Sequence, residues 1–260
     1  MNFEHNPEEK INEGWEKSRR NEVIDRLLKS EDLQFVMESL PGFKEAFTDL
    51  DTIDCSDGRV LQGKKIGIAG SGLLLSSEEL AKFIAKYKGK IKTVTTHRDC
   101  GAAGIKFKTL KPEEIPAGVK TADEYGTYRG EALAEELGAE HNFLDMEQMA
   151  NEYHNETAIV LDQTGEFDST NLKKFPEHFV CSGAGLGFSP EYMKAEVKTL
   201  AGIALGHHGF GHRFDANNPF YIIVAAESQE ELARWQDIAK EAVADLGDKV
   251  AIKGFVAPEK

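Results

Sequence analysis

Several segments of the chain carry apolar residues at every third or fourth position, the spacing of a helix with one buried face. Residues that cap helices stand before four of these segments. Ser76, Thr121 and Ser228 are each followed three residues later by a glutamate, which is the capping-box pattern. Ser189 precedes Pro190, and proline is typical of the first helical position. These patterns predict helices over residues 7–29, 31–39, 77–88, 121–137, 189–205 and 228–246.

Short apolar runs, several of them rich in β-branched residues, separate the helices and predict strands. The run at 64–70 leads into a helix and then into the run at 91–97, which predicts a parallel pair with a right-handed crossover. Residues 106–120 and 206–219 show little periodicity and are predicted to be loops. The pattern indicates an α/β fold with a mostly parallel central sheet flanked by helices, and no internal repeat. The predicted strands are 47–55, 64–70, 91–97, 157–165, 220–226 and 249–256.

The N-terminal helical region has a narrow apolar stripe. Such a helix needs another surface to cover it, which is either its own domain or a second subunit. We therefore divide the chain into an N-terminal helical arm (1–45) and a single α/β domain (46–260), of which 106–220 is an atypical, insertion-rich region. The stripe over 7–29 consists of Ile11, Trp15, Val23, Ile24, Leu27 and Leu28.

Composition and charge narrow the possible functions. The chain has 260 residues, of which 40% are hydrophobic, and a formal net charge of −14. Because no basic cluster is longer than pairs such as Lys64-Lys65, binding to nucleic acid or to a membrane surface is not expected. No segment approaches the roughly 18 apolar residues of a membrane helix, and the first residues do not resemble a secretory signal, so we expect a cytoplasmic protein. Three cysteines, an odd count, do not suggest a disulfide framework.

Five chemically reactive residues stand at the ends of two predicted strands. Cys55, Asp57 and Arg59 follow the first strand, and His97 and Cys100 follow the strand at 91–97. The carboxyl ends of parallel strands meet at one edge of an α/β sheet, so we expect these side chains to converge. Two thiolates and one imidazole are a ligand set that zinc prefers. The sequence predicts zinc bound by Cys55, His97 and Cys100, with a fourth position left open as in catalytic zinc sites.

Asp57 and Arg59 are predicted to act beside that metal. An aspartate next to an arginine stays ionised, so Asp57 can accept a hydrogen bond from zinc-bound hydroxide and orient it. Arg59 would hold Asp57 through a two-pronged contact. A structural ion pair in a turn is the alternative interpretation of these two residues.

The two motifs together resemble the signatures of the β-class carbonic anhydrases. CSDGRV and HRDCGAAG match that family's Cys-x-Asp-x-Arg and His-x-x-Cys-Gly. The resemblance implies a zinc lyase that reversibly hydrates carbon dioxide to bicarbonate, with Cys55, His97 and Cys100 as ligands and Asp57 and Arg59 as the catalytic dyad. It also implies a homodimer or a dimer of dimers, with N-terminal helices that reach over the partner. In some members the aspartate of the dyad moves onto zinc, so either water or Asp57 fills the fourth position.

Two departures from the family widen the choice of function. The motif resemblance covers about residues 47–105, and Cys55 and His97 are 97 − 55 = 42 residues apart, fewer than is typical of the family. The shorter segment would reshape access to zinc, so a carbonyl sulfide or carbon disulfide hydrolase is the alternative enzyme. Region 106–220 has no familiar counterpart, and a non-catalytic zinc-binding protein is the alternative of another class.

Three further features have both a functional and a structural interpretation. Gly67, Gly70 and Gly72 lie between a strand and a helix, but their spacing departs from the dinucleotide-binding pattern and favours a tight turn. Cys181 is interpreted as a small buried hydrophobic residue. The third feature is a group of histidines in the loop at 206–219, which form either a proton relay or a solvated surface: His207, His208 and His212.

Overall fold

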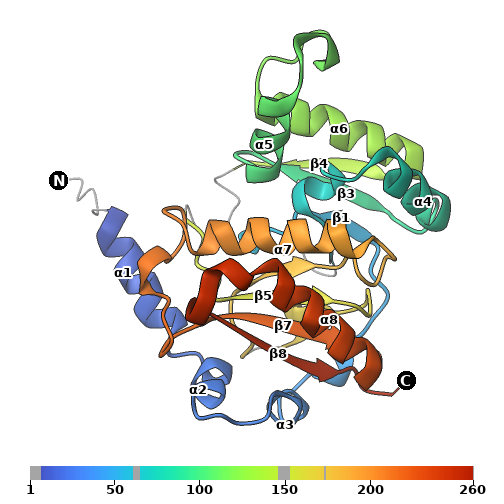
Figure 1. The fold of residues 1–260 in the computed structure, drawn as a ribbon. Coiled ribbons are helices and arrows are strands. Elements are labelled where there is room, and N and C mark those ends of the chain that lie inside the picture. The colour runs from blue at the N-terminus through green and yellow to red at the C-terminus, as the bar shows by residue number, and fades with distance from the viewer. Residues whose placement is uncertain (1–6, 61–64, 146–152, 173, 260) are drawn as a thin grey trace.

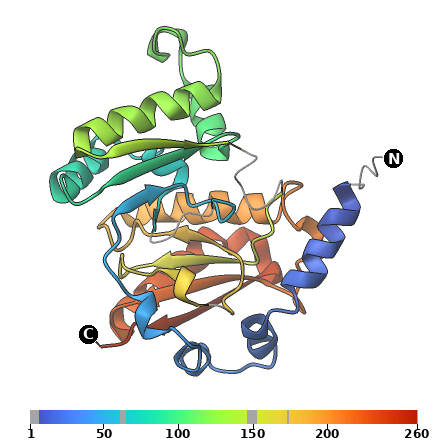
Figure 2. The same cartoon turned by 180° about the vertical axis from the view of Figure 1, so that it is seen from behind.

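The computed structural model describes residues 7–60, 65–145, 153–172 and 174–259. It is an α/β structure with two four-stranded sheets, flanked by helices (Figures 1 and 2). The strands are β1 Thr52–Asp54, β2 Lys65–Gly67, β3 Thr93–His97, β4 Glu140–Leu144, β5 Ala158–Asp162, β6 His178–Cys181, β7 Phe220–Ala226 and β8 Val250–Val256.

The sheets have the orders β2-β1-β3-β4 and β6-β5-β7-β8, and the strand pairs in both are parallel. The α/β class is thus confirmed, but the single central sheet that we predicted is wrong. Two strands, β4 and β6, escaped the prediction. β4 exposes alternate residues and lacks a continuous apolar run, and β6 is only four residues long.

The two sheets have the same topology, which the sequence pattern did not reveal. In each sheet the first strand in the sequence pairs with the second and third, and the third pairs with the fourth. In both, a helix connects the second strand to the third, and helical structure connects the third to the fourth. The chain is therefore built as two halves of one topology, and the expectation of no internal repeat is wrong at the level of structure.

The helices agree closely with the capping signals. Ser76, Thr121, Ser189 and Ser228 each accept a hydrogen bond from a backbone N–H in the first turn of the helix that follows. The loop predicted from residue 106 begins later, because the helix that follows Cys100 continues to Thr109. The helices are α1 Pro7–Ser18, α2 Glu22–Leu28, α3 Leu33–Glu38, α4 Ser77–Tyr87, α5 Gly101–Thr109, α6 Ala122–Leu137, α7 Pro190–Ala204 and α8 Gln229–Ala242.

The second sheet is buried on both faces. Every residue of β5 and β7 is buried. Alternate residues of these strands, such as Ile159 and Ile222, belong to a core shared with α7 and α8, whereas Val160 and Ile223 belong to a second core with α2 and α3. The sheet therefore lies between two helical layers, and α7 lies on the side of the first sheet (Figure 1).

The N-terminal arm packs on its own chain. The predicted helix over 7–29 is broken, because the Asn21 side chain accepts hydrogen bonds from Val23 N and Ile24 N and starts a new helix, α2. Trp15 of α1 contacts Phe210 and Phe214 edge-on. The chain itself therefore covers most of the narrow apolar stripe, although Leu28 is 39% exposed. Contact between the arm and a partner subunit stays a prediction.

The two halves meet at β2 and β6. Ser182 N donates to Gly67 O at 2.8 Å, and Val180 N donates to Ser56 O at 3.1 Å. A side chain at Gly67 would have its Cβ 2.4 Å from Val180 O, so only glycine permits this approach. The close contact brings the second half against the segment that follows β1, where the candidate metal ligands lie.

Candidate metal centre

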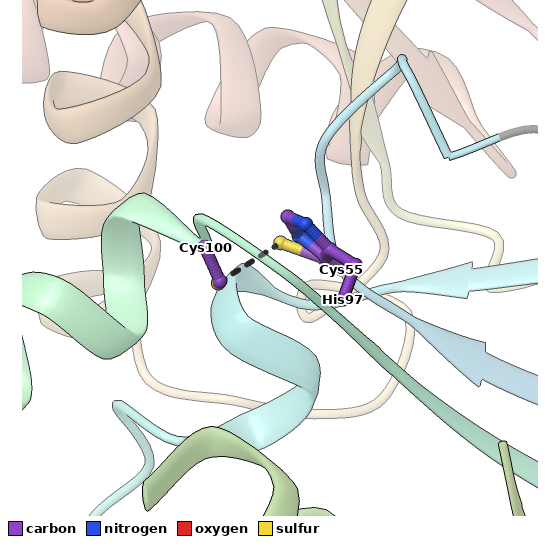
Figure 3. Close-up of side chains that lie close together, drawn as sticks. All are labelled: Cys55, His97 and Cys100. Atoms are coloured by element: carbon purple, nitrogen blue, oxygen red, sulfur yellow. Dashed lines mark hydrogen bonds between the residues drawn. The ribbon is translucent and has the colours of Figure 1, made fainter. Parts of the chain in front are cut away.

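Three chain segments bring the predicted zinc ligands together. Cys55 follows the last residue of β1, His97 is the last residue of β3, and Cys100 immediately precedes α5. β1 and β3 are neighbours in the sheet, so their carboxyl ends lie side by side. Figure 3 shows Cys55 and His97 next to one another, with Cys100 reaching toward them from the start of α5.

The geometry of these side chains suits a tetrahedral metal. The Sγ atoms of Cys55 and Cys100 are 3.9 Å apart, and one ligand atom from each of the three residues lies within 4.8 Å of the others. Two thiolates about 2.3 Å from one zinc ion at a tetrahedral angle are about 3.8 Å apart. All three residues are buried. The arrangement is compatible with zinc without identifying the metal.

The histidine presents the correct nitrogen. His97 Nδ1 is 2.9 Å from the carbonyl oxygen of Arg98, so Nδ1 carries the proton and donates it to that oxygen. The other nitrogen, Nε2, is buried and has no hydrogen-bond partner. Buried polar atoms are rarely left without a partner. A buried nitrogen without a partner, directed toward two cysteine sulfurs, is the observation that indicates a bound cation.

The three candidate ligands shift one another's pKa values. Hydrogen bonding from Cys100, together with the adjacent His97, holds the pKa of Cys55 well below its usual value despite burial. The Cys55 thiolate and burial together raise the pKa of Cys100. Burial lowers the pKa of His97, but the neighbouring Cys55 thiolate outweighs it and raises this pKa to about 9. Without a metal, Cys100 therefore keeps its proton more readily than Cys55 does, and His97 takes up a second proton more readily than an isolated imidazole.

The glycine-rich segment forms a tight turn against the first thiolate. Gly70, Ser71 and Gly72 have φ values of 60°, 54° and 96°, in the left-handed region. This conformation directs the Gly70 N–H to Cys55 Sγ at 3.3 Å. The turn interpretation is thus confirmed, and it gives the glycines a role at the candidate metal site. Cys100 lies at the N-terminus of α5, whose dipole favours a thiolate.

Asp57 and Arg59 form a buried ion pair beside the ligands. Arg59 Nη2 donates to Asp57 Oδ2 at 2.7 Å, Nε lies 3.1 and 3.2 Å from the two carboxylate oxygens, and Arg59 N donates to Oδ1 at 3.0 Å. Burial acts to raise the pKa of Asp57, but Arg59 and His154 outweigh it and hold this pKa well below its usual value. Asp57 Oδ2 is 3.9 Å from His97 Nε2. The carboxylate is therefore ionised and adjacent to the metal ligands.

Sequence reasoning missed two residues next to this pair, both from the segment before β5. His154 Nδ1 lies 3.3 Å from Glu156 Oε2 and 3.7 Å from Asp57 Oδ1. Glu156 is 1% exposed and its charge also acts on Arg59. No motif marks these residues in the sequence, because nearly a hundred residues separate them from Asp57.

A third missed residue is Glu196 on α7. Its Oε1 accepts hydrogen bonds from Ser56 Oγ at 2.9 Å and from the backbone N–H of Ala69. Burial raises the pKa of this carboxyl group to about 7. The helical pattern places position 196 on the buried face of α7, so a charged residue on that face was the available signal.

The other candidates of the sequence lie outside the metal centre. The three loop histidines are exposed. The described residues hold two groups whose ligand atoms lie close enough for one metal ion, and neither includes these histidines: Cys55, His97 and Cys100, and Asp57, His154 and Glu156. His208 O accepts a hydrogen bond from His154 N at 2.8 Å, so the backbone of this loop lies next to His154. A proton relay through the three histidines stays a prediction. Cys181 is fully buried in the main core, as predicted.

Comparison with protein-family models, with curated proteins and with solved structures finds no match to this chain. The resemblance to β-class carbonic anhydrases is therefore one of motifs, and the geometry of the side chains carries the functional argument. Among the described helices, none combines the length and the apolar character that crossing a bilayer requires.

Proposed function

We propose that this protein is a zinc lyase that reversibly hydrates carbon dioxide to bicarbonate, in the manner of the β-class carbonic anhydrases. One observation carries the proposal. An ionised carboxylate, held by Arg59, lies 3.9 Å from an unpartnered nitrogen of His97, which in turn faces the thiols of Cys55 and Cys100. A closed structural zinc site has four protein ligands and no need of such a carboxylate.

A zinc ion held by these three side chains would supply a Lewis acid that makes water nucleophilic near neutral pH. Oδ2 of Asp57 would accept a hydrogen bond from the attacking oxygen. This bond would fix the direction of the lone pair with which that oxygen attacks carbon dioxide. Arg59 binds both oxygens of Asp57, so the carboxylate cannot rotate away. Preorganised groups of this kind lower the barrier because they need no rearrangement when the reaction occurs.

Burial of the centre favours a small, uncharged substrate. Asp57, Arg59 and the three ligands are each 7% exposed or less. Carbon dioxide and carbonyl sulfide are both of this kind, so a carbonyl sulfide or carbon disulfide hydrolase stays the alternative enzyme. A homodimer or dimer of dimers also stays a prediction.

The test uses zinc-loaded protein and an isosteric variant. We expect about one zinc per chain and stopped-flow hydration of carbon dioxide well above the buffer rate. Asp57→Asn should keep the zinc and lose about 100-fold in rate, since it removes the acceptor that orients the nucleophile. Parallel assays with carbonyl sulfide identify the preferred gas. Fully zinc-loaded protein that accelerates neither reaction would refute the enzymatic proposal and favour a non-catalytic zinc-binding protein.

A further inference from the structure

One carboxyl group of the second half reaches the metal centre from α7. Glu196 is 2% exposed, and Oε2 has no hydrogen-bond partner in the described residues. A carboxyl group in such a place lowers stability relative to an apolar side chain of similar size. Its two hydrogen bonds through Oε1 are therefore the feature that explains its presence.

Both hydrogen bonds act on the surroundings of Cys55. Ser56, which donates its hydroxyl to Glu196, is bonded directly to Cys55 in the chain. Ala69, which donates its N–H, precedes Gly70, and Gly70 N donates to Cys55 Sγ. One carboxylate oxygen thus joins the segment after β1 to the turn after β2, and these two segments determine where the sulfur lies.

The internal repeat shows what this helix position holds elsewhere. α4 is the counterpart of α7, and both have serine caps, Ser76 and Ser189. Counting seven residues from each cap (83 − 76 = 196 − 189) pairs Glu196 with Phe83, a buried apolar residue. At the helix position of Glu196, the first half therefore holds an apolar side chain.

The counterpart of the metal site in the second half holds no ligand set. Asp162 ends β5 as Asp54 ends β1, and the carbonyl oxygens of both accept a hydrogen bond from the segment after the next strand, so Gln163 stands where Cys55 does. Asp162 accepts hydrogen bonds from its own turn, including Thr164 N and Gly165 N. The second half has therefore kept the topology while losing the site.

We propose that Glu196 is a positioning residue of the metal centre, supplied by the second half to the first, which places Cys55 Sγ through Ser56 and Ala69. The proposal rests on the proposed function only in that Cys55, His97 and Cys100 bind the metal, and not on the reaction. Loss of hydration activity with intact metal binding would leave it standing.

The test measures zinc affinity by competition with a chromophoric chelator, and the visible spectrum of the Co²⁺ form. Glu196→Ala should weaken zinc binding by about 10- to 100-fold, the usual effect of losing an outer contact, and should change the cobalt bands. Glu196→Gln keeps an acceptor oxygen and should stay within about threefold of wild type with an unchanged spectrum. The matched control is Val197→Ala, which truncates a buried neighbour on α7 and should change neither readout.

Two results would overturn the proposal. One is wild-type zinc affinity and an unchanged cobalt spectrum in Glu196→Ala. The other is an equal loss in Val197→Ala, which would show a general loss of stability. If Glu196→Ala does not fold, Ser56→Ala replaces it in the test. Weaker zinc binding by Ser56→Ala, together with unchanged zinc binding by Glu196→Gln, supports the proposal. Unchanged zinc binding by Ser56→Ala refutes it.

Discussion

The buried pair of Asp57 and Arg59 should respond very unequally to the loss of either partner. Their side chains are 7% and 6% exposed, and the closest contact is 2.7 Å. Arg59→Met leaves two buried carboxylates, Asp57 and Glu156, with His154 near both of them. Leaving a buried charge without its partner costs about 3–5 kcal/mol. We expect a loss of that size in the free energy of unfolding of the metal-free protein at pH 7.

Asp57→Asn should cost less, about 1–2 kcal/mol, the range for a weakened buried hydrogen bond. The asparagine oxygen can still accept from Arg59, and the nearby Glu156 still balances the guanidinium charge. Urea unfolding with chelator and reductant present, followed by circular dichroism, measures both variants. Equal losses, or a larger loss in Asp57→Asn, would refute this account of the charges.

The same reasoning gives the sign of the pH dependence. Arg59 holds the pKa of Asp57 below its usual value, so the pair stabilises the fold above about pH 3.9, the pKa of an aspartate in the unfolded chain. In Arg59→Met, burial without the arginine raises this pKa instead. The stability deficit of Arg59→Met should therefore shrink as the pH falls from 7 toward 4. A deficit that stays constant over this range would show that lost packing, and not charge, causes it.

Three further predictions concern metal binding and the contact between the halves. At pH 6.5, zinc binding should release at least two protons, because the raised pKa values of His97 and Cys100 keep both groups protonated in the metal-free site; calorimetry in buffers of different ionisation enthalpy measures this, and a release of fewer than two would contradict the raised pKa values. Cys100→Ser should weaken zinc binding at least tenfold in a chelator competition, since a hydroxyl is a poorer zinc ligand than a thiolate; wild-type affinity would remove Cys100 from the ligand set. Gly67→Val should lower the free energy of unfolding, measured with urea, by about 3 kcal/mol or more, because the added Cβ meets the backbone of β6. The control Gly104→Ala, whose added Cβ meets no atom within 4 Å, should leave the stability unchanged. Similar stabilities of the two variants would contradict the close approach of the halves.

The sequence alone determined most of the elements and the inner part of the site. Helical periodicity and serine or threonine caps located α4, α6, α7 and α8, because these signals act within a few residues of the chain. Cys55, His97 and Cys100 were predicted as ligands because parallel strands that are neighbours end at the same edge, and the structure does bring them together.

Tertiary structure alone decided what surrounds that centre. The way in which the two sheets meet depends on the contact of β2 with β6. This contact joins segments about 115 residues apart in the sequence. His154, Glu156 and Glu196 come from the second half. No local pattern marks His154 and Glu156, and the signal for Glu196 was a charged residue on the buried face of α7. Periodicity and motifs report interactions between near neighbours in the chain, whereas packing between distant segments placed these three carboxyl and imidazole groups against Asp57 and Ser56.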